Sequence, residues 1–295
     1  MADSQSTPHA SVRGKTAADR GNPGAGSRGQ DSRGVSRWLL CPPVLSLRFT
    51  AVWLRNLRVW RKLMLPSILG NFGEPLLYLL ALGYGLGQFV GEVESMPYMV
   101  FLASGIVCSA AMTGATFEAL YSAYTRLTQQ QTWAAMLAAP LNVDDVVLGE
   151  IAWAATKALI NASAIVLVAA LLGLVAGPEA ILVLPVILLA GLAFAGIAMI
   201  VTALSPSYDF FLYYFTLIMT PMLLLSGVFF PLSSLPDAVG VGAQMLPLAH
   251  VVMLVRPLMT GGSIDTPLLH LGVILGYIVA TYWISAALAR RRLIR

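Results

Sequence analysis

Charged residues are scarce in this chain. Only 11% of its 295 residues are Asp, Glu, Lys or Arg, whereas 58% are hydrophobic. Soluble domains carry about 25% charged residues, so the composition excludes an ordinary soluble protein and predicts an integral membrane protein. Cysteine is also scarce, since the chain has only Cys41 and Cys108. Two cysteines exclude a disulfide-bonded extracellular scaffold.

Side chains for catalysis or metal binding are equally sparse. The three histidines, His9, His250 and His270, lie far apart in the sequence and do not have the spacing of metal ligands. The chain has no Gly-x-Ser-x-Gly motif, which presents the nucleophile in many hydrolases. We therefore expect neither an enzyme nor a metal site, and no cofactor bound by this chain.

The positive charge lies at the two ends of the chain. Of 18 Lys and Arg residues, 11 precede Pro66 and four follow Leu288. The positive-inside rule then places both termini in the cytoplasm, which requires an even number of membrane spans. This topology explains the basic character of the chain better than nucleic-acid binding does, so we expect no nucleic-acid partner.

Two segments are expected before the first span. Residues 1–43 are predicted to form a disordered, basic cytoplasmic tail, because residues 1–37 are rich in Ser, Gly, Arg and Ala and contain almost no large apolar residue. They also lack the apolar core of a cleavable signal peptide.

Residues 44–63 have the pattern of a basic amphipathic helix, with Asn56 as the residue that does not fit. Such a helix lies in the lipid headgroup layer, and we favour this over an ordinary solvated helix. Its basic side chains fall within an arc of roughly 80° at helical spacing: Arg48, Arg55, Arg58 and Lys62. Its apolar side chains gather on the other side: Leu45, Phe49, Val52, Trp53, Trp60 and Leu63.

The rest of the chain, residues 44–295, is predicted to be an all-α transmembrane domain with six spans. The segment from Leu223 to Pro257 begins in an apolar run. The part after Pro231 is also apolar, but prolines interrupt it too often for it to cross the bilayer, which needs about 20 apolar residues. We expect a broken helical element there, two short helices at the outer membrane face between spans five and six. The predicted spans are about 66–89, 98–122, 147–175, 180–204, 210–230 and 267–289.

Four ionisable residues fall within the predicted spans, where charge is costly and often functional. Glu118 and Glu150 are expected near the cytoplasmic interface, hydrated. Lys157 is seven residues after Glu150, so the two share a helix face. Glu74 is deeper, and it is either a structural partner for another helix or a residue lining a substrate route.

The cytoplasmic loop between the second and third spans contains a short apolar helix, Thr132 to Ala139, which Pro140 ends. Asp144 and Asp145 follow at the start of the third span, where the helix dipole favours carboxylates. A short apolar helix in this position either lies under the membrane or docks in the groove of a partner protein. The residues by themselves leave both possibilities open.

Several separate segments resemble one family. The sequences SGVFFPLSSLP, LPLAH and RPL of the outer element are similar to the type-2 ABC exporter permeases. The sequences ATFEALYSAY, QTWAAMLAAPL, VLGEIAWAATKA and SPSYDFFLYY are similar to the nodulation protein J branch of that family, the lipo-oligosaccharide permeases. The resemblance covers about residues 45–295.

This resemblance implies six spans, an N-terminal interfacial helix and a homodimer. It also implies a separate ATPase subunit of the nodulation protein I type. That subunit, and not this chain, is expected to bind ATP-Mg. The short cytoplasmic helix is then the coupling helix that fits a groove on the ATPase, with contacts from Trp133, Met136 and Leu137. The coupling residues are Gln131, Trp133, Met136, Leu137 and Leu141.

The implied cargo is a lipo-oligosaccharide or related glycolipid that crosses the bacterial inner membrane by a lateral route between the first and fifth spans of opposing protomers. Alternatives are another amphiphile, such as a drug or a polysaccharide, and a proton-coupled secondary transporter that uses Glu74 or Glu118. Candidate residues of the route are Glu74, Phe210, Tyr213 and Tyr214. Candidate residues of the outer element are Phe229, Phe230, Pro231, His250 and Arg256. Arg256 is expected to anchor lipid headgroups rather than to contact cargo.

Overall fold

The computed structural model describes residues 42–62 and 64–293, and for residues 65–72, 74 and 75 it describes the backbone alone. The predicted basic tail, Cys41 and the side chain of Glu74 lie outside this description.

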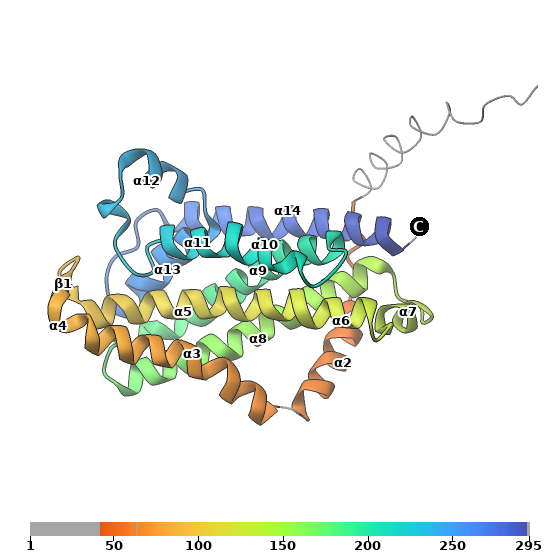
Figure 1. Ribbon diagram of the computed structural model, residues 1–295, viewed down its shortest axis with the longest axis horizontal. Helices are drawn as coiled ribbons and strands as arrows, with labels where there is room; N and C mark the ends of the chain where they lie inside the picture. The colour runs from red at the N-terminus through yellow and green to blue at the C-terminus, as the bar shows by residue number, and fades with distance from the viewer. Residues whose placement is uncertain (1–41, 63, 294–295) are drawn as a thin grey trace, which may run out of the picture. The chain divides into compact units, whose positions relative to one another are not determined.

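The described chain is mostly helical (Figure 1). The helices up to the cytoplasmic loop are α2 (Phe49–Arg61), α3 (Met64–Gly85), α4 (Gly87–Val90), α5 (Tyr98–Phe117), η1 (Glu118–Ser122) and α6 (Ala123–Thr128). Then come α7 (Thr132–Leu137), α8 (Val143–Leu171), η2 (Pro178–Leu182), α9 (Val183–Leu204), α10 (Phe210–Tyr214), η3 (Phe215–Met219) and α11 (Thr220–Leu225). The last are η4 (Leu232–Ser234), α12 (Asp237–Ala243), α13 (Pro247–Thr260) and α14 (Pro267–Leu293). A two-stranded hairpin, β1 (Glu92–Val93) and β2 (Met96–Pro97), precedes α5.

Four described helices are long and apolar enough to cross a bilayer: Tyr98–Thr128, Val143–Leu171, Pro178–Leu204 and Pro267–Leu293. They coincide with the second, third, fourth and sixth predicted spans. The fifth predicted span forms a shorter apolar helix, Phe210–Leu225, and the described part of the first forms another, Leu76–Val90. The chain is therefore a helical membrane protein with at least four candidate spans, and the full count of six remains a prediction.

The segment after the fifth predicted span contains two helices, α12 and α13, that meet at an angle of 86°. Together they are apolar enough for a broken span or a re-entrant loop, and their placement at the outer face remains a prediction. The predicted end of the segment at Pro257 is wrong, because α13 continues to Thr260 and ends at Gly261, whose φ of 74° lies in the left-handed region. Proline removes one backbone donor but does not have to stop a helix when neighbouring groups satisfy the freed carbonyls. The hydroxyl of Thr260 donates to the carbonyl of Arg256 at 2.9 Å, in the last turn of α13.

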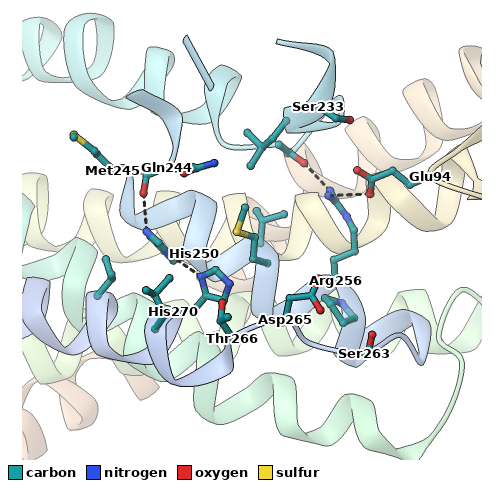
Figure 2. A pocket seen from close by; sticks show the side chains of 17 residues that line it. Glu94, Ser233, Gln244, Met245, His250, Arg256, Ser263, Asp265, Thr266 and His270 are labelled. Carbon is teal, nitrogen blue, oxygen red and sulfur yellow. Dashed lines mark hydrogen bonds and ion pairs between the residues drawn. The ribbon is translucent and has the colours of Figure 1, made fainter. Parts of the chain in front are cut away.

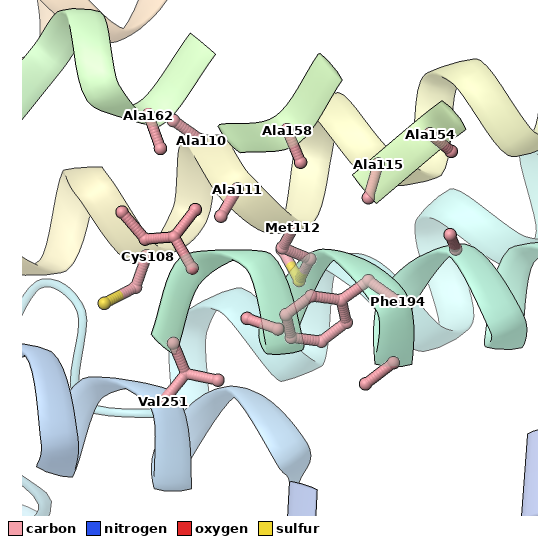
Figure 3. Close-up of a cluster of buried hydrophobic side chains, with 14 of the residues drawn as sticks. Cys108, Ala110, Ala111, Met112, Ala115, Ala154, Ala158, Ala162, Phe194 and Val251 are labelled. Carbon is pink, nitrogen blue, oxygen red and sulfur yellow. The ribbon is translucent and has the colours of Figure 1, made fainter. Parts of the chain in front are cut away.

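Small side chains let the central helices approach closely. Alanines of α5 and α8 face one another beside Phe194 of α9 and Val251 of α13 (Figure 3). A Cβ atom on Gly191 of α9 would lie 3.0 Å from the Cα atom of Ala155 in α8. Lipid offers apolar surface as good as leucine does, so helices in membranes associate through such close backbone packing.

The N-terminal amphipathic helix, α2, packs against α8. A Cβ atom on Gly149 would lie 2.5 Å from the Cβ atom of Val52, so glycine is needed for this contact. The indole Nε1 of Trp53 donates to the hydroxyl of Thr156 at 2.9 Å. Of its predicted apolar side, Leu45 is exposed, whereas Val52 is buried. The placement of α2 in the headgroup layer remains a prediction.

The start of α8 joins the two ends of the described chain. Asn142 and Asp145 form a capping box that satisfies free backbone N–H groups of the first turn. The neighbouring carboxylate of Asp144 pairs with Arg290 of α14 and accepts the backbone N–H of Val44 at 2.8 Å. The predicted position of both aspartates at this helix start is confirmed.

The axes of the long helices α5, α8, α9 and α14 are roughly aligned, so the described bundle has two ends (Figure 1). α7 and the last turns of α14 lie at one end, beside α2. The hairpin and α12 lie at the opposite end. The predicted cytoplasmic and outer elements are therefore at opposite ends of the bundle.

Candidate functional site

A buried ionic cluster lies near the α7 end of the bundle. Arg126 donates from Nε to Oε1 of Glu150 and from Nη2 to Oε1 of Glu118, both at 2.9 Å. Lys157 donates to the other oxygen of Glu118 at 2.8 Å. Two carboxylates and two cations balance, which is what burial of charge requires.

The hydration predicted for two of these residues is wrong, whereas the shared face of Glu150 and Lys157 agrees with the structure. Glu118 and Glu150 are not hydrated, since both are buried and Glu150 is only 1% exposed. Lys157 shares a helix with Glu150, yet it pairs with Glu118, because α5 and η1 pack against that face of α8. A carboxylate within a span does not need hydration when a neighbouring helix provides a cation that pairs with it.

Uncharged donors complete the cluster. The indole N–H of Trp153 donates to Glu118 at 2.9 Å, and the amide of Asn56 donates to Glu150 at 3.2 Å. The residue that does not fit the amphipathic pattern of α2 is thus the one that joins α2 to the cluster. Beside it, burial and the nearby charge of Arg126 lower the pKa of Arg55.

The predicted coupling helix is present as α7, but its surface differs from the prediction. Trp133 is 1% exposed and its indole N–H donates to Glu150 at 3.3 Å, so it holds α7 to the membrane domain and is not available to a partner. Met136, Leu137 and Leu141 are half-buried against the core. The predicted contact role of Trp133 is therefore wrong.

The free face of α7 consists of small residues. Ala134, Ala135 and Ala138 are exposed, and so is Gln131. Gln131 precedes the helix with a φ of 51°, in the left-handed region that non-glycine residues rarely adopt. Its side-chain amide donates to the carbonyl of Thr128 at 2.8 Å, which helps to hold this turn. A groove that receives α7 would contact an alanine surface.

The candidate route residues on α10 do not share one environment. Phe210 and Tyr213 are exposed, as a surface of the route requires. Tyr214 is buried within its own protomer. The prediction that it contacts cargo is therefore wrong for this conformation. The side chain of Glu74 lies outside the described residues.

Arg256 of the outer element is not a headgroup anchor. Its side chain is 12% exposed, and its Nη2 and Nε donate to the carbonyl of Gly227 at 2.6 Å and the hydroxyl of Ser104 at 3.1 Å. The guanidinium carbon lies 3.6 Å from the ring centroid of Phe101. Nη1 of Arg256 lies 4.0 Å from Oε2 of Glu94 (Figure 2). This role was not predictable from the sequence, because the sequence around a single arginine does not indicate which carbonyl its side chain contacts.

His250 of the outer element pairs with a histidine of α14. The two Nδ1 atoms of His250 and His270 lie 2.8 Å apart, and Nε2 of His250 lies 2.8 Å from the carbonyl oxygen of Gln244 (Figure 2). A carbonyl only accepts, so Nε2 of His250 carries a proton, and in the neutral pair His270 donates to Nδ1 of His250. Sequence reasoning missed this pair, since 20 residues separate its members.

The other predicted outer residues, Phe229, Phe230 and Pro231, are half-buried. Just before them, the backbone of Val228 presses against α5, because a Cβ atom on Gly105 would lie 2.3 Å from its carbonyl oxygen. The outer element therefore rests directly on the second predicted span.

The apolar helices, the bent outer pair and the short helix fixed to a buried ionic cluster define a multi-pass helical membrane protein. A family model described as ABC-2 type transporter matches residues 48–260. The chain belongs to this family, so it is a membrane component of an ABC transporter.

Relatives agree with this assignment. The chain is 50% identical over 253 residues to nodulation protein J of Rhizobium leguminosarum bv. viciae, with 86% of this chain and 98% of the relative covered. It is 46% identical over 253 residues to nodulation protein J of Bradyrhizobium diazoefficiens, with 86% and 97% covered. A more distant relative is the inner membrane transport permease YadH of Escherichia coli, 21% identical over 238 residues, with 80% and 91% covered. The resemblance to the nodulation protein J branch is thus confirmed.

Proposed function

We propose that this chain is the permease of an ATP-driven exporter that moves a lipo-oligosaccharide or related glycolipid across the bacterial inner membrane. The observation that carries the proposal is the similarity to nodulation protein J over almost the whole length of those relatives. The name of the distant relative, an inner membrane transport permease, supports the location. In this proposal both termini are cytoplasmic and the permease is a homodimer.

A separate ATPase of the nodulation protein I type supplies the energy and holds ATP-Mg. It binds the alanine face of α7, and Gln131 at the entry to the helix borders that contact. Closure of the ATPase dimer around ATP moves α7, and Trp133 and Glu150 carry this movement to α2 and α8. The ATPase shifts the permease between inward- and outward-facing states because it binds one of them more tightly.

Proton-coupled transport is the weaker candidate. Its proton carrier would be Glu74, whose side chain lies outside the described residues, or Glu118. Arg126, Lys157 and the indole of Trp153 all donate to the carboxylate of Glu118. Two adjacent cations favour the charged form of a carboxylate, so Glu118 is a poor site for proton exchange. Export of a different amphiphile, such as a drug or a polysaccharide, would use the same machinery.

The test is reconstitution of the purified permease and its ATPase in lipid vesicles with a fluorescent lipo-oligosaccharide. Movement that depends on ATP and on both subunits supports the proposal. Movement that follows an imposed proton gradient without the ATPase overturns it.

The docking surface is tested with Ala135→Glu, which places a charge on the exposed face of α7 and leaves the anchoring side chains intact. We expect at least a tenfold loss of ATPase co-purification and of ATP-dependent transport. The matched control is Ala238→Glu, an exposed alanine of the short helix α12 at the other end of the bundle. Wild-type co-purification of Ala135→Glu would exclude α7 as the docking helix.

A further inference from the structure

Two histidine rings meet at the wall of a cavity at the hairpin end of the bundle. His250 of α13 and His270 of α14 both line this cavity of about 840 Å³, and their Nδ1 atoms lie 2.8 Å apart (Figure 2). Both side chains are buried in the protein. A small solute therefore reaches the pair through the cavity.

A hydrogen bond prepares His250 as a metal ligand. Its Nε2 donates to the carbonyl oxygen of Gln244 at 2.8 Å, which fixes the tautomer and leaves Nδ1 as the nitrogen with a lone pair. Histidines that bind metals almost always donate their other ring N–H to a carbonyl, a carboxylate or water in this way. His250 is thus already held in the tautomer that a metal ion requires.

The distance between the two Nδ1 atoms suits one shared ion. Imidazole nitrogens bind a transition metal at about 2.0–2.1 Å, so two of them 2.8 Å apart subtend about 85–90° at the ion. Right angles belong to the square-planar or tetragonal geometry of Cu²⁺ and Ni²⁺, whereas Zn²⁺ prefers the wider angles of a tetrahedron. On binding, the Nδ1 proton of His270 moves to its Nε2 through water, so both rings stay neutral.

The charge of the lining favours a cation. Glu94 and Asp265 are the carboxylates among the described residues that line the cavity, and Arg256 is the cation. Nη1 of Arg256 lies 4.0 Å from Oε2 of Glu94, so these two charges balance. That pairing leaves the negative charge of Asp265, five residues before His270, to attract an incoming ion.

The pair makes an open site rather than a closed one. Within the part of the chain that the structure describes, no third histidine, cysteine or carboxylate completes a metal-binding group. Structural sites surround their ion with four protein ligands. Here the cavity leaves room for water at the remaining positions, so the ion exchanges with solution.

We propose that His250 and His270 bind one divalent transition-metal ion of the Ni²⁺ or Cu²⁺ type through their Nδ1 atoms, and that this ion links α13 to α14. No metal site was expected from the sequence, because 20 residues separate the two histidines, but the packing of α13 on α14 brings them together. The site requires neither the cargo nor the ATPase.

The test is titration of the purified permease in detergent with NiCl₂, followed by isothermal titration calorimetry. The protein carries no histidine tag, and alanine replaces His9 and Cys41, since both residue types bind metals. We expect one Ni²⁺ per chain. The thermal midpoint should rise with Ni²⁺ concentration, because an ion that binds only the folded state stabilises it.

The variant His270→Asn separates metal binding from packing, because its amide still donates toward Nδ1 of His250 but offers no ring nitrogen. We expect a Kd for Ni²⁺ at least tenfold weaker than that of the parent protein. Asp265→Asn, at an exposed position, should weaken the Kd several-fold. Asp237→Asn, an exposed carboxylate of α12 outside the lining, is the matched control and should bind as the parent does.

Three results would overturn the site. One is the absence of saturable Ni²⁺ binding, and another is an unchanged Kd in His270→Asn. The third does not depend on any variant and is displacement of Ni²⁺ by an excess of Mg²⁺. Mg²⁺ prefers oxygen ligands, so such displacement would place Ni²⁺ on carboxylates instead of the histidine pair.

Discussion

Arg256 joins the outer element to α5 through its shape as much as its charge. Its planar guanidinium reaches the carbonyl of Gly227 and the hydroxyl of Ser104, and at the same time it lies over the ring of Phe101. A lysine carries the same charge but has no planar fork and does not stack in this way. Geometry at this residue therefore decides stability.

We expect Arg256→Lys to lower the free energy of unfolding by about 2–4 kcal/mol, because hydrogen bonds to a charged group are worth about 1.5–3 kcal/mol each. Thermal unfolding in detergent, followed by tryptophan fluorescence, measures the effect. Arg58→Lys, on the exposed side of α2, is the control and should leave the midpoint unchanged. Equal midpoints for the two variants would contradict the role given to Arg256.

Glu150 is a second residue whose substitution we expect to destabilise the protein, because of the groups around its side chain. Arg126, Trp133 and Asn56 all donate to its carboxylate. Glu150→Gln keeps the size of the side chain but leaves a buried excess of positive charge. Removing one partner of a buried ion pair costs about 3–5 kcal/mol, and we expect a loss of that size in the same unfolding assay. Glu179→Gln, at an exposed carboxylate of η2, should not change it.

At the scale of elements, α5 and the segment after α11 depend on one glycine. Gly105 allows the backbone of Val228 to lie directly on α5. Gly276 of α14 has nothing within 4 Å of a Cβ atom, so the two glycines form a matched pair on apolar helices.

We expect Gly105→Ala to destabilise the protein by about 1–3 kcal/mol, since an added methyl group in a packed core forces the backbone apart. Gly276→Ala should be neutral, or stabilising by up to about 1 kcal/mol from helix propensity. Thermal unfolding of both variants gives the comparison. A stabilising Gly105→Ala would show that Val228 moves away without cost.

Hydropathy predicted four of the spans, and prolines predicted the break between α12 and α13, because both signals are local in the sequence. The buried ionic cluster was not predictable in this way. Glu118 and Lys157 are 39 residues apart, and Asn56 and Glu150 are 94 apart, so their pairing depends on which helix faces pack together. Local periodicity also could not show that Trp133 faces inward.

At the scale of the whole molecule, the helical segment formed by α10, η3 and α11 has one side in contact with its own chain. Phe211 is buried there and Phe215 packs on Phe117, with 4.9 Å between ring centroids. The opposite side exposes large apolar side chains, among them Leu212, Tyr213 and Leu217. In the proposed homodimer this side faces the second protomer rather than lipid.

A cysteine at position 217 tests this contact, in a chain whose two native cysteines are replaced by alanine. Leu217 is 69% exposed, and the control position Leu171 at the end of α8 is 79% exposed. We expect oxidation to cross-link Leu217→Cys into dimers in native membranes, and Leu171→Cys to remain monomeric on denaturing gels. Cross-linking at both positions, or at neither, would contradict the dimer face.

Asp144 contacts residues close to both ends of the described chain. Its carboxylate accepts from the backbone of Val44 and pairs with Arg290, close to the end of the last helix. The salt bridge between Asp144 and Arg290 forms only once α14 has been synthesised. A chain cut short before Arg290 therefore lacks the contact that ties the start of α8 to the last helix.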